Sequence, residues 1–311
     1  MPAEWGTLST EASNPASEGL DTLTSEEVVS LLLEEDQRGL AAAGRSRKDI
    51  AEAASWVAET LEAGGGVVFA GAGTSGRLGI LEAAECPPTF GTDPEQIRAV
   101  IAGGPEAVFE AREGAEDVFS DGAGAVEEFG AGDLLVAVSA SSATPFVLGA
   151  LASAQGNGAR TILVTCAPPG EIAAVADLVL ALDTGPEVLT GSTRLKAASA
   201  TKAVLNAITT AAMVGLGKVY GNFMVDLRPG SAKLRDRALR IVEAAGEVSR
   251  EEAERLYDTA DGEVKTAIIM ALCKFEVECS REHLREAGGH VRKALADCSA
   301  AERGGSKPSD R

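Results

Sequence analysis

The stretch from Val67 to Glu85 constrains the fold of this chain more than any other part of the sequence. Residues 67–70 are all apolar and follow three consecutive glycines, a pattern typical of a short, buried parallel strand. Residues 71–76 read Gly-Ala-Gly-Thr-Ser-Gly, and residues 77–85 are rich in good helix formers. The order predicts a strand, a glycine-rich loop that carries two hydroxyl groups, and a helix.

This loop has the composition of an anion-binding site. Glycines let the backbone approach a ligand, and the first turn of the following helix offers unpaired N–H groups and the positive end of the helix dipole. Gly73, Thr74, Ser75 and Gly76 are therefore candidate phosphate-binding residues. The glycine spacing also fits the G-x-G-x-x-G pattern of dinucleotide-binding proteins, but the acidic residue expected about 20 positions later is not clearly present. A purely structural turn is the remaining interpretation.

Strands and helices alternate along the chain as far as about residue 227. Further strands are expected at residues 98–101, 134–138, 161–166 and 178–182. Helices are expected from residue 25, at 46–62, from 106 to about 117, at 146–155 and from 195 to about 216. This alternation predicts an α/β fold built on a doubly wound, parallel, five-stranded sheet.

A second loop rich in hydroxyl groups follows the strand expected at residues 134–138. It supplies Ser139, Ser141 and Thr144 as candidate phosphate-binding residues. Ligands of such sheets bind outside the carboxyl ends of the strands. Because loops 73–76 and 139–144 both leave carboxyl ends, they can converge on one site.

The composition changes after residue 227, where short, charged helices replace the strands. This part contains an approximate repeat, and each unit of the repeat reads as a helix, a glycine turn and a second helix. The predicted organisation is therefore an N-terminal segment and helix (1–45), an α/β domain (46–227) and a small helical domain (228–300). Residues 301–311 are expected to be disordered.

The charge and the rarer residues exclude several functions. A net charge of −19 argues against nucleic-acid and anionic-membrane partners. The two histidines, His283 and His290, both lie near the C-terminus, so the α/β part must use carboxylates for most of its acid–base chemistry. The five cysteines form no C-x-x-C pair, and the N-terminus has no signal-peptide pattern. We therefore expect a cytoplasmic protein with reduced thiols.

Several ordered motifs resemble those of the N-acetylmuramic acid 6-phosphate etherase family. They extend over nearly the whole chain, at residues 8–11, 71–79, 85–91 (Glu-Cys-Pro-Pro-Thr-Phe-Gly), 101–105, 113–117 (Glu-Gly-Ala-Glu-Asp), 185–196, 224–226 and 288–292. The resemblance implies a sugar isomerase (SIS) domain that binds phosphosugars, in a cytoplasmic bacterial enzyme of cell-wall recycling. It also implies a homodimer whose active sites draw on both subunits.

The resemblance further implies a reaction and the residues that carry it. The family cleaves the lactyl ether at C3 of the sugar to N-acetylglucosamine 6-phosphate and D-lactate, without a metal or another cofactor. Elimination followed by hydration needs an acid and a base. The family's acid corresponds to Glu85 and its base to Glu116. Further candidates for contacts with the substrate are Arg77, Ser192, Arg194 and Lys196.

One motif departs from the family's pattern. Where the etherases commonly read Ser-Gly-Arg-Thr-Pro-Tyr, residues 141–146 read Ser-Ser-Ala-Thr-Pro-Phe, so a glycine, a cation and a phenol are missing. The departure concerns the substrate more than the fold. Two alternative functions therefore remain, a regulator that binds a sugar phosphate without turnover and an aldose–ketose isomerase.

Overall fold

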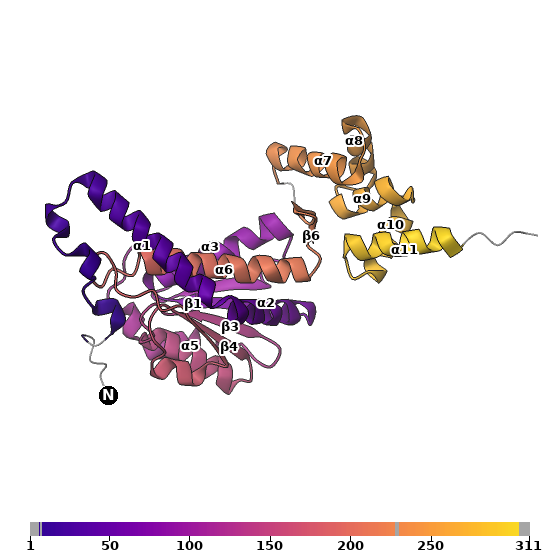
Figure 1. The fold of residues 1–311 in the computed structure, drawn as a ribbon. Coiled ribbons are helices and arrows are strands. Elements are labelled where there is room, and N and C mark those ends of the chain that lie inside the picture. Colours follow the sequence, from indigo (N-terminus) through magenta and orange to yellow (C-terminus); the bar gives the residue numbers. More distant parts are fainter. Residues whose placement is uncertain (1–5, 7, 228–229, 305–311) are drawn as a thin grey trace, which may run out of the picture. The chain divides into compact units, whose positions relative to one another are not determined.

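The computed structural model describes residues 6, 8–227 and 230–304 (Figure 1). The chain divides into two compact units: unit 1 comprises residues 1–84 and 94–212, and unit 2 comprises residues 85–93 and 213–311. The domain boundary expected after residue 227 differs from this division. The reason is that apolar side chains such as Phe223 and Leu227 pack into the core of unit 2.

A parallel sheet of five strands forms the centre of unit 1, and its strand order is β2-β1-β3-β4-β5. The strands are β1 (Val67–Gly71), β2 (Ile97–Ile101), β3 (Leu134–Val138), β4 (Arg160–Thr165) and β5 (Leu178–Ala181). Every residue of β1 and of β3 is buried, as expected for short apolar runs in a sheet that is covered on both faces. The predicted α/β fold is confirmed.

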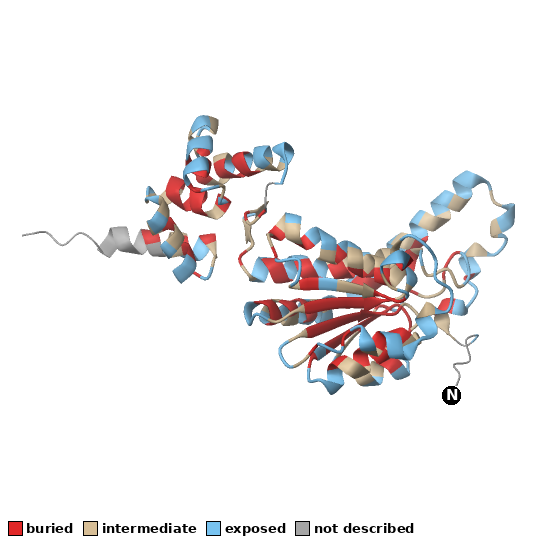
Figure 2. Ribbon diagram, turned by 180° about the vertical axis from the view of Figure 1, so that it is seen from behind, coloured by how far each residue is buried: buried red, intermediate tan, exposed pale blue. Residues whose placement is uncertain are grey.

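Helices cover both faces of this sheet (Figure 1). Helices α2 (Arg47–Glu62), α3 (Gly73–Phe90) and α6 (Lys196–Gly215) lie on one face, and α5 (Pro145–Gly156) lies on the other. Helix α4 (Phe119–Gly124) packs on α5 so closely that a Cβ at Gly122 would lie 1.8 Å from the carbonyl oxygen of Phe146. Figure 2 shows the strands as a buried layer between the helices.

Three short 3-10 helices, Ser9–Glu11, Pro15–Ser17 and Leu20–Thr22, lie between residue 8 and helix α1 (Ser25–Arg45). A capping box starts α1. The Thr24 hydroxyl accepts the N–H of Glu27 at 3.4 Å, and the Glu27 carboxylate accepts the N–H of Thr24 at 2.8 Å. These bonds satisfy two backbone donors that the helix itself leaves unpaired.

The described residues of unit 2 form helices, among them the end of α3, and one short hairpin. Strands β6 (Val219–Tyr220) and β7 (Phe223–Met224) pair antiparallel. The helices are α7 (Ala232–Gly246), α8 (Arg250–Thr259), α9 (Val264–Cys273), α10 (Val277–Glu286) and α11 (Val291–Gly304). Left-handed glycines lie in the turns that join α8 to α9 and α10 to α11, with φ of 85° at Gly262 and 78° at Gly289. The predicted repeat of helix, glycine turn and helix is confirmed.

The C-terminal end of unit 2 differs from its prediction. Helix α11 continues to Gly304, so the expected disorder is wrong for residues 301–304. The alanine, glutamate and arginine there are good helix formers that extend the preceding turns. The rest of the expected disordered tail, residues 305–311, lies outside the described residues.

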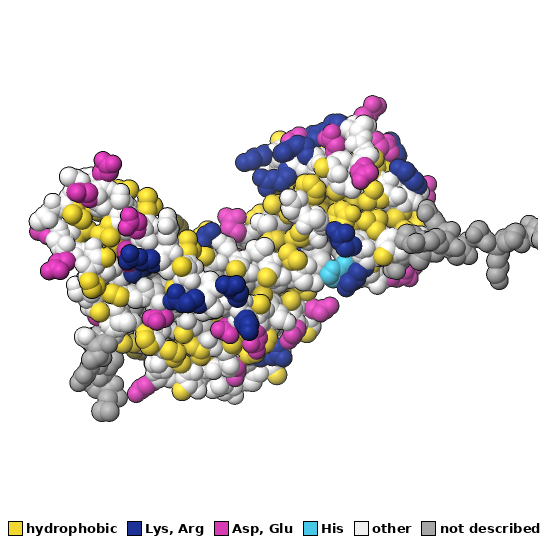
Figure 3. All heavy atoms as spheres, viewed as in Figure 1, with side chains coloured by type: hydrophobic (Ala, Val, Ile, Leu, Met, Phe, Trp, Pro, Cys, Tyr) yellow, Lys and Arg dark blue, Asp and Glu magenta, His cyan; other side chains and the backbone are white. Residues whose placement is uncertain are grey.

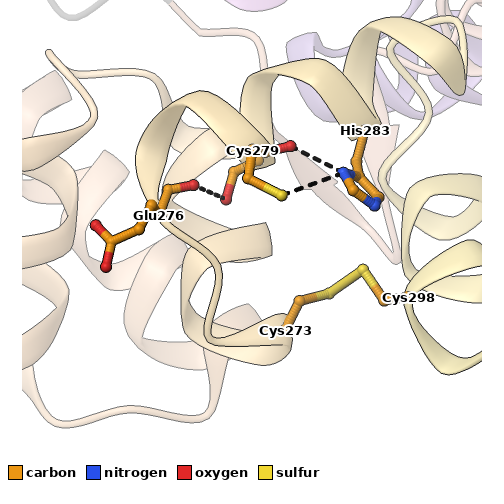
Figure 4. Close-up of a disulfide and its surroundings, with 6 residues drawn as sticks. Cys273, Glu276, Cys279, His283 and Cys298 are labelled. Atoms are coloured by element: carbon orange, nitrogen blue, oxygen red, sulfur yellow. Dashed lines mark hydrogen bonds between the residues drawn. A yellow bond between two sulfur atoms is a disulfide. The ribbon is translucent and has the colours of Figure 1, made fainter. Parts of the chain in front are cut away.

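The structure contradicts the expectation that all five cysteines are reduced. Cys273, at the end of α9, and Cys298, in α11, form a disulfide with their Cα atoms 6.3 Å apart (Figure 4). The remaining three cysteines, Cys86, Cys166 and Cys279, are not part of this disulfide. Spacing in the sequence does not reveal such a bond, because it depends on how α9 and α11 are placed in space.

Removing this disulfide should destabilise unit 2. The bond joins residues separated by 25 positions, and a cross-link over a loop of that size stabilises a fold by about 3 kcal/mol. We expect the double replacement of Cys273 and Cys298 with Ser to lower the free energy of unfolding by that order, as measured by urea denaturation without reductant. Replacing the free Cys279 with Ser is the matched control. Equal midpoints for the double variant and the wild type would argue against the bond.

Charged side chains of both signs share the surface that Figure 3 shows. Over the whole sequence the acidic residues are in excess, 47 against 28 Lys and Arg. An anionic ligand must therefore be bound by local donors, because the overall field repels it. No helix within the described residues is long and apolar enough to cross a membrane.

Candidate active site

The candidate site lies where β1 ends and α3 begins. Residues Gly73 to Gly76 form the first turn of α3, so the predicted loop before the helix is too long. Close packing explains the difference, since a Cβ at Gly76 would lie 2.5 Å from Cγ1 of Ile101 and 2.7 Å from the carbonyl oxygen of Gly71. Glycine thus lets the helix start directly at the sheet. The predicted phosphate-binding residues stay together, now at the N-terminus of a helix, whose open end suits an anion. The N–H of Gly76 is already used, since it donates to the carbonyl oxygen of Ala72 at 3.3 Å.

A pocket of about 170 Å³ lies beside this turn. Gly73 and Arg77 of α3 line it together with residues 111–116. Its lining includes Glu116, which the short 3-10 helix η6 (Ala115–Asp117) carries. Two stretches that the sequence singled out separately therefore meet at one pocket.

Glu116 does not lie on the helix predicted for residues 106–117. The segment forms two short 3-10 helices instead, η5 (Pro105–Val108) and η6, and Gly114 before η6 is left-handed with φ of 73°. Glu116 is an exposed residue. Its carboxyl group is nevertheless partly removed from water, which raises its pKa, and the charges of Asp117 and Glu113 raise that pKa further. A raised pKa suits a carboxylate that exchanges protons near neutral pH.

The raised pKa of Glu116 predicts a pH dependence. A base acts only when it is ionised, so kcat/KM should rise with pH through a midpoint above the ordinary carboxyl value of 4.5. Replacing Asp117 with Asn removes one of the charges that raise this pKa, and the acid side of the profile should move to lower pH. Measuring kcat/KM across the acidic and neutral range tests both statements. A shift to higher pH in the Asp117→Asn variant would contradict them.

Arg77 has a structural task beside the pocket. Its guanidinium group donates to the carbonyl oxygens of Val108, at 2.8 Å, and Ala107, at 2.7 Å. These bonds hold η5 against α3 and so fix one wall of the pocket. The role of Arg77 as a substrate contact stays a prediction.

The second predicted phosphate loop, residues 139–144, follows β3, which pairs directly with β1. The hydroxyl groups of Ser139 and Thr144 bond each other at 2.8 Å, and Ser139 is buried. Ser141 is half-buried. The loop therefore has a fixed conformation next to the first turn of α3, as the topology of the sheet requires.

Ser142 explains how the loop tolerates its departure from the family's pattern. Its backbone is left-handed, with φ of 58°, a conformation that glycine adopts at little cost. The serine is buried, and its hydroxyl oxygen accepts the N–H of Gly170 at 3.0 Å. Glycine would adopt this backbone conformation without help, whereas serine needs the hydrogen bond to stabilise it. The Ser142 hydroxyl is buried and accepts a bond from the loop after β4, so we assign it to holding the loop rather than to binding a ligand.

Glu85, the predicted acid, lies on α3 with an exposed side chain. It belongs to residues 85–93, which group with unit 2, so its approach to the pocket of unit 1 stays a prediction.

Glu82, one helical turn before Glu85, is a buried carboxylate that the sequence motifs did not indicate. The Glu82 carboxylate is 5% exposed and accepts hydrogen bonds from Asn206, at 2.7 Å, and from the hydroxyl of Thr209. A partner 124 positions away leaves no local signal in the sequence.

Lys196 is built into the core rather than left at the surface. Its ammonium group forms an ion pair with the Glu35 carboxylate, and both residues are at most 3% exposed. Asn14 donates to the same carboxylate at 2.9 Å. Burial pushes the pKa of Glu35 up, but the hydrogen bonds from Lys196 and Asn14 outweigh it and hold the pKa below its ordinary value. The Glu35 carboxyl group is therefore ionised at neutral pH.

The segment before α6 contains one further buried carboxylate. Glu187 accepts the N–H groups of Lys196, at 3.2 Å, and Ala197, at 2.9 Å, and so caps the start of α6. Among the predicted contacts in this segment, Ser192 is half-buried and Arg194 is exposed. Within the described ranges, no group of three or more His, Cys, Asp or Glu side chains is arranged to hold a metal ion.

The fold and the pocket together define a class. A five-stranded parallel sheet, a helix N-terminus suited to an anion and a nearby carboxylate with a raised pKa are the features of an α/β domain that binds phosphosugars. The chain matches the family described as the glucokinase regulatory protein N-terminal SIS domain over residues 49–155, and the SIS domain over residues 113–211. It is a SIS-domain protein.

Relatives of nearly equal length define the family within this class. An N-acetylmuramic acid 6-phosphate etherase of Geobacillus thermodenitrificans is 46% identical over 93% of this chain and 98% of its own. An etherase of Synechocystis is 43% identical over 94% of this chain and 96% of its own. An etherase of Salinibacter ruber is 46% identical over 93% of this chain and 94% of its own. The chain belongs to the N-acetylmuramic acid 6-phosphate etherase family.

Proposed function

We propose that this protein is a lyase that cleaves the D-lactyl ether of N-acetylmuramic acid 6-phosphate. Its products are N-acetylglucosamine 6-phosphate and D-lactate. The near full-length similarity to proteins named as etherases carries this proposal. The position of Glu116 in a pocket beside the N-terminus of α3 supports it.

The reaction begins at C2 of the open-chain sugar. The C2–H bond is acidic because it lies next to the C1 aldehyde, and Glu116, ionised, removes the proton. The electron pair of that bond forms the C2–C3 double bond, and the C3–O bond breaks. Glu85, protonated, gives its proton to the departing lactate oxygen. Water then adds at C3 of the unsaturated aldehyde, and a proton returns to C2.

Two groups of donors would bind the phosphate. The first turn of α3 offers the backbone N–H groups of residues 73–75 and the hydroxyls of Thr74 and Ser75, together with the positive end of the helix dipole. Loop 139–144 offers its own backbone and the half-buried hydroxyls of Ser141 and Thr144, while the buried hydroxyl of Ser139 bonds Thr144 and orients it. Fixed donors of this kind hold the sugar so that C2 stays within reach of the base.

The resemblance to the family also supports proposals about assembly. We propose a cytoplasmic homodimer whose active site draws on both subunits, with no cofactor. Light scattering on the purified protein tests the dimer. A species with the mass of one 31.7 kDa chain at working concentration would contradict it.

The direct test of the activity is an enzymatic assay for D-lactate after incubation with N-acetylmuramic acid 6-phosphate. The proposed function predicts stoichiometric release of D-lactate. The match to the regulatory-protein SIS domain keeps a non-catalytic regulator as the second candidate. Thermal stabilisation by the phosphosugar without any D-lactate would favour that regulator, and ketose formation from a hexose 6-phosphate would favour an isomerase.

A further inference from the structure

Arg112 is a cation at the same pocket as Glu116. It lies four positions before Glu116 on the segment that joins η5 to η6, and both residues line the pocket. Gly103, just after β2, fixes this segment. Its φ is 83°, and a Cβ there would lie 3.1 Å from the Cβ of Arg112 and 3.2 Å from the Cβ of Ala115. The segment therefore rests directly on the backbone of Gly103, and the place of Arg112 relative to Glu116 is set by packing.

The guanidinium group of Arg112 is available to a ligand. Its side chain is 44% exposed and pairs with Glu106, whose side chain is 78% exposed. Solvent screens an exposed ion pair of this kind, so a ligand carboxylate can displace Glu106. The other cation that lines the pocket, Arg77, already donates to two carbonyl oxygens.

The chemistry of the proposed substrate offers two anions, the phosphate at C6 and the carboxylate of the lactyl group at C3. The phosphate is assigned to the first turn of α3 and to loop 139–144, which carries no charged side chain. Glu116 acts at C2, and C3 is the neighbouring atom. Arg112 is on the same short segment as Glu116, so the lactyl carboxylate, which is attached next to the carbon where Glu116 acts, is the anion that this cation suits.

The geometry points to Arg112 as the residue that binds the lactyl carboxylate and so distinguishes the ether substrate from the sugar product. The planar guanidinium group matches a carboxylate with two parallel hydrogen bonds. It also offsets the negative charge of Glu113 and Glu116, which line the pocket and would otherwise repel the lactyl group. This inference rests on the proposed function.

The test compares a ligand that has the lactyl group with one that lacks it. Replacing Arg112 with Gln should raise KM for N-acetylmuramic acid 6-phosphate about tenfold or more, because a charge-assisted contact is lost. The inhibition constant of N-acetylglucosamine 6-phosphate should stay within about twofold of wild type, since this ligand has no lactyl carboxylate. Replacing Arg112 with Lys should give an intermediate KM, because the charge remains without the two-pronged geometry.

A matched control is available in the same unit. Arg98 is also 44% exposed and pairs with an exposed glutamate, Glu95, but it does not line this pocket. The Arg98→Gln variant should behave as wild type. An equal rise in KM and in the inhibition constant in Arg112→Gln would place Arg112 at a part that both ligands share and overturn the inference. No change in either constant would also overturn it.

The outcomes separate this inference from the proposed function. If the wild-type protein releases no D-lactate, the proposed function fails. Calorimetric dissociation constants of the two phosphosugars then test Arg112 alone. The inference survives only if Arg112→Gln weakens the lactyl-bearing ligand selectively.

Discussion

Replacing Glu116 with Gln should abolish the release of D-lactate while the protein stays folded. Glutamine keeps the size and the hydrogen-bonding capacity of the side chain but cannot accept the C2 proton. Loss of a general base typically costs about 10²- to 10⁴-fold in rate, and no other base replaces Glu116 in the proposed mechanism. The measurement is kcat for D-lactate release, with thermal unfolding as the check on folding.

Glu113 provides the matched control for this prediction. It lines the same pocket and precedes Glu116 by three positions, but the mechanism gives it no proton to carry. The Glu113→Gln variant should keep kcat at neutral pH within about tenfold of wild type, and the acid side of its pH profile should move to lower pH, as in Asp117→Asn. If Glu116→Gln retained a tenth or more of the wild-type rate, Glu116 would not be the base.

Replacing Glu35 with Ala should destabilise unit 1 by about 3–5 kcal/mol, because it leaves the Lys196 ammonium buried without its partner. The free energy of unfolding from urea denaturation measures the effect. Replacing both residues with apolar ones, Glu35→Leu with Lys196→Met, removes the charges together and should recover most of the loss. An exposed pair gives the comparison: Glu59→Gln, which breaks the ion pair of Glu59 with Arg160, should cost far less than Glu35→Ala, because solvent screens an exposed pair.

The same double variant decides what Lys196 does. The sequence marked this lysine as a possible contact with the substrate, whereas the structure places its ammonium on a buried carboxylate. If the role is structural, the folded double variant keeps its D-lactate activity. A folded but inactive double variant would show that Lys196 touches the substrate. If Glu35→Ala lowered the free energy of unfolding no more than Glu59→Gln does, the buried ion pair itself would be contradicted.

The strands could be predicted from the sequence because their signal is local. Residues 67–70 and 134–138 are short apolar runs bounded by glycine or polar residues, and both became strands that are buried along their whole length. The glycine turns at Gly262 and Gly289 also carry a local signal, since the backbone there is left-handed. Apolar runs and the glycines at their ends are enough to predict such elements.

Other features depend on contacts between distant residues and left no such signal. Helix α3 starts at Gly73 because Gly76 packs closely on Ile101. The sequence does not reveal this start, because glycine has a low helix propensity and reads as a loop. The ion pair of Lys196 with Glu35 joins residues 161 positions apart. The motifs did indicate Glu116, but the 3-10 turn that presents it replaces a predicted helix, because Gly114 takes a left-handed conformation.

The central claim is that a base removes the C2 proton and that the ether breaks between C3 and oxygen. Mass spectrometry of both products after turnover in D₂O, and separately in H₂¹⁸O, tests it most directly. The account predicts deuterium at C2 and ¹⁸O at C3 of N-acetylglucosamine 6-phosphate, with the D-lactate unlabelled in carbon-bound hydrogen and in the former ether oxygen. Absence of D-lactate, or ¹⁸O in the lactate hydroxyl group with none in the sugar, would contradict the account.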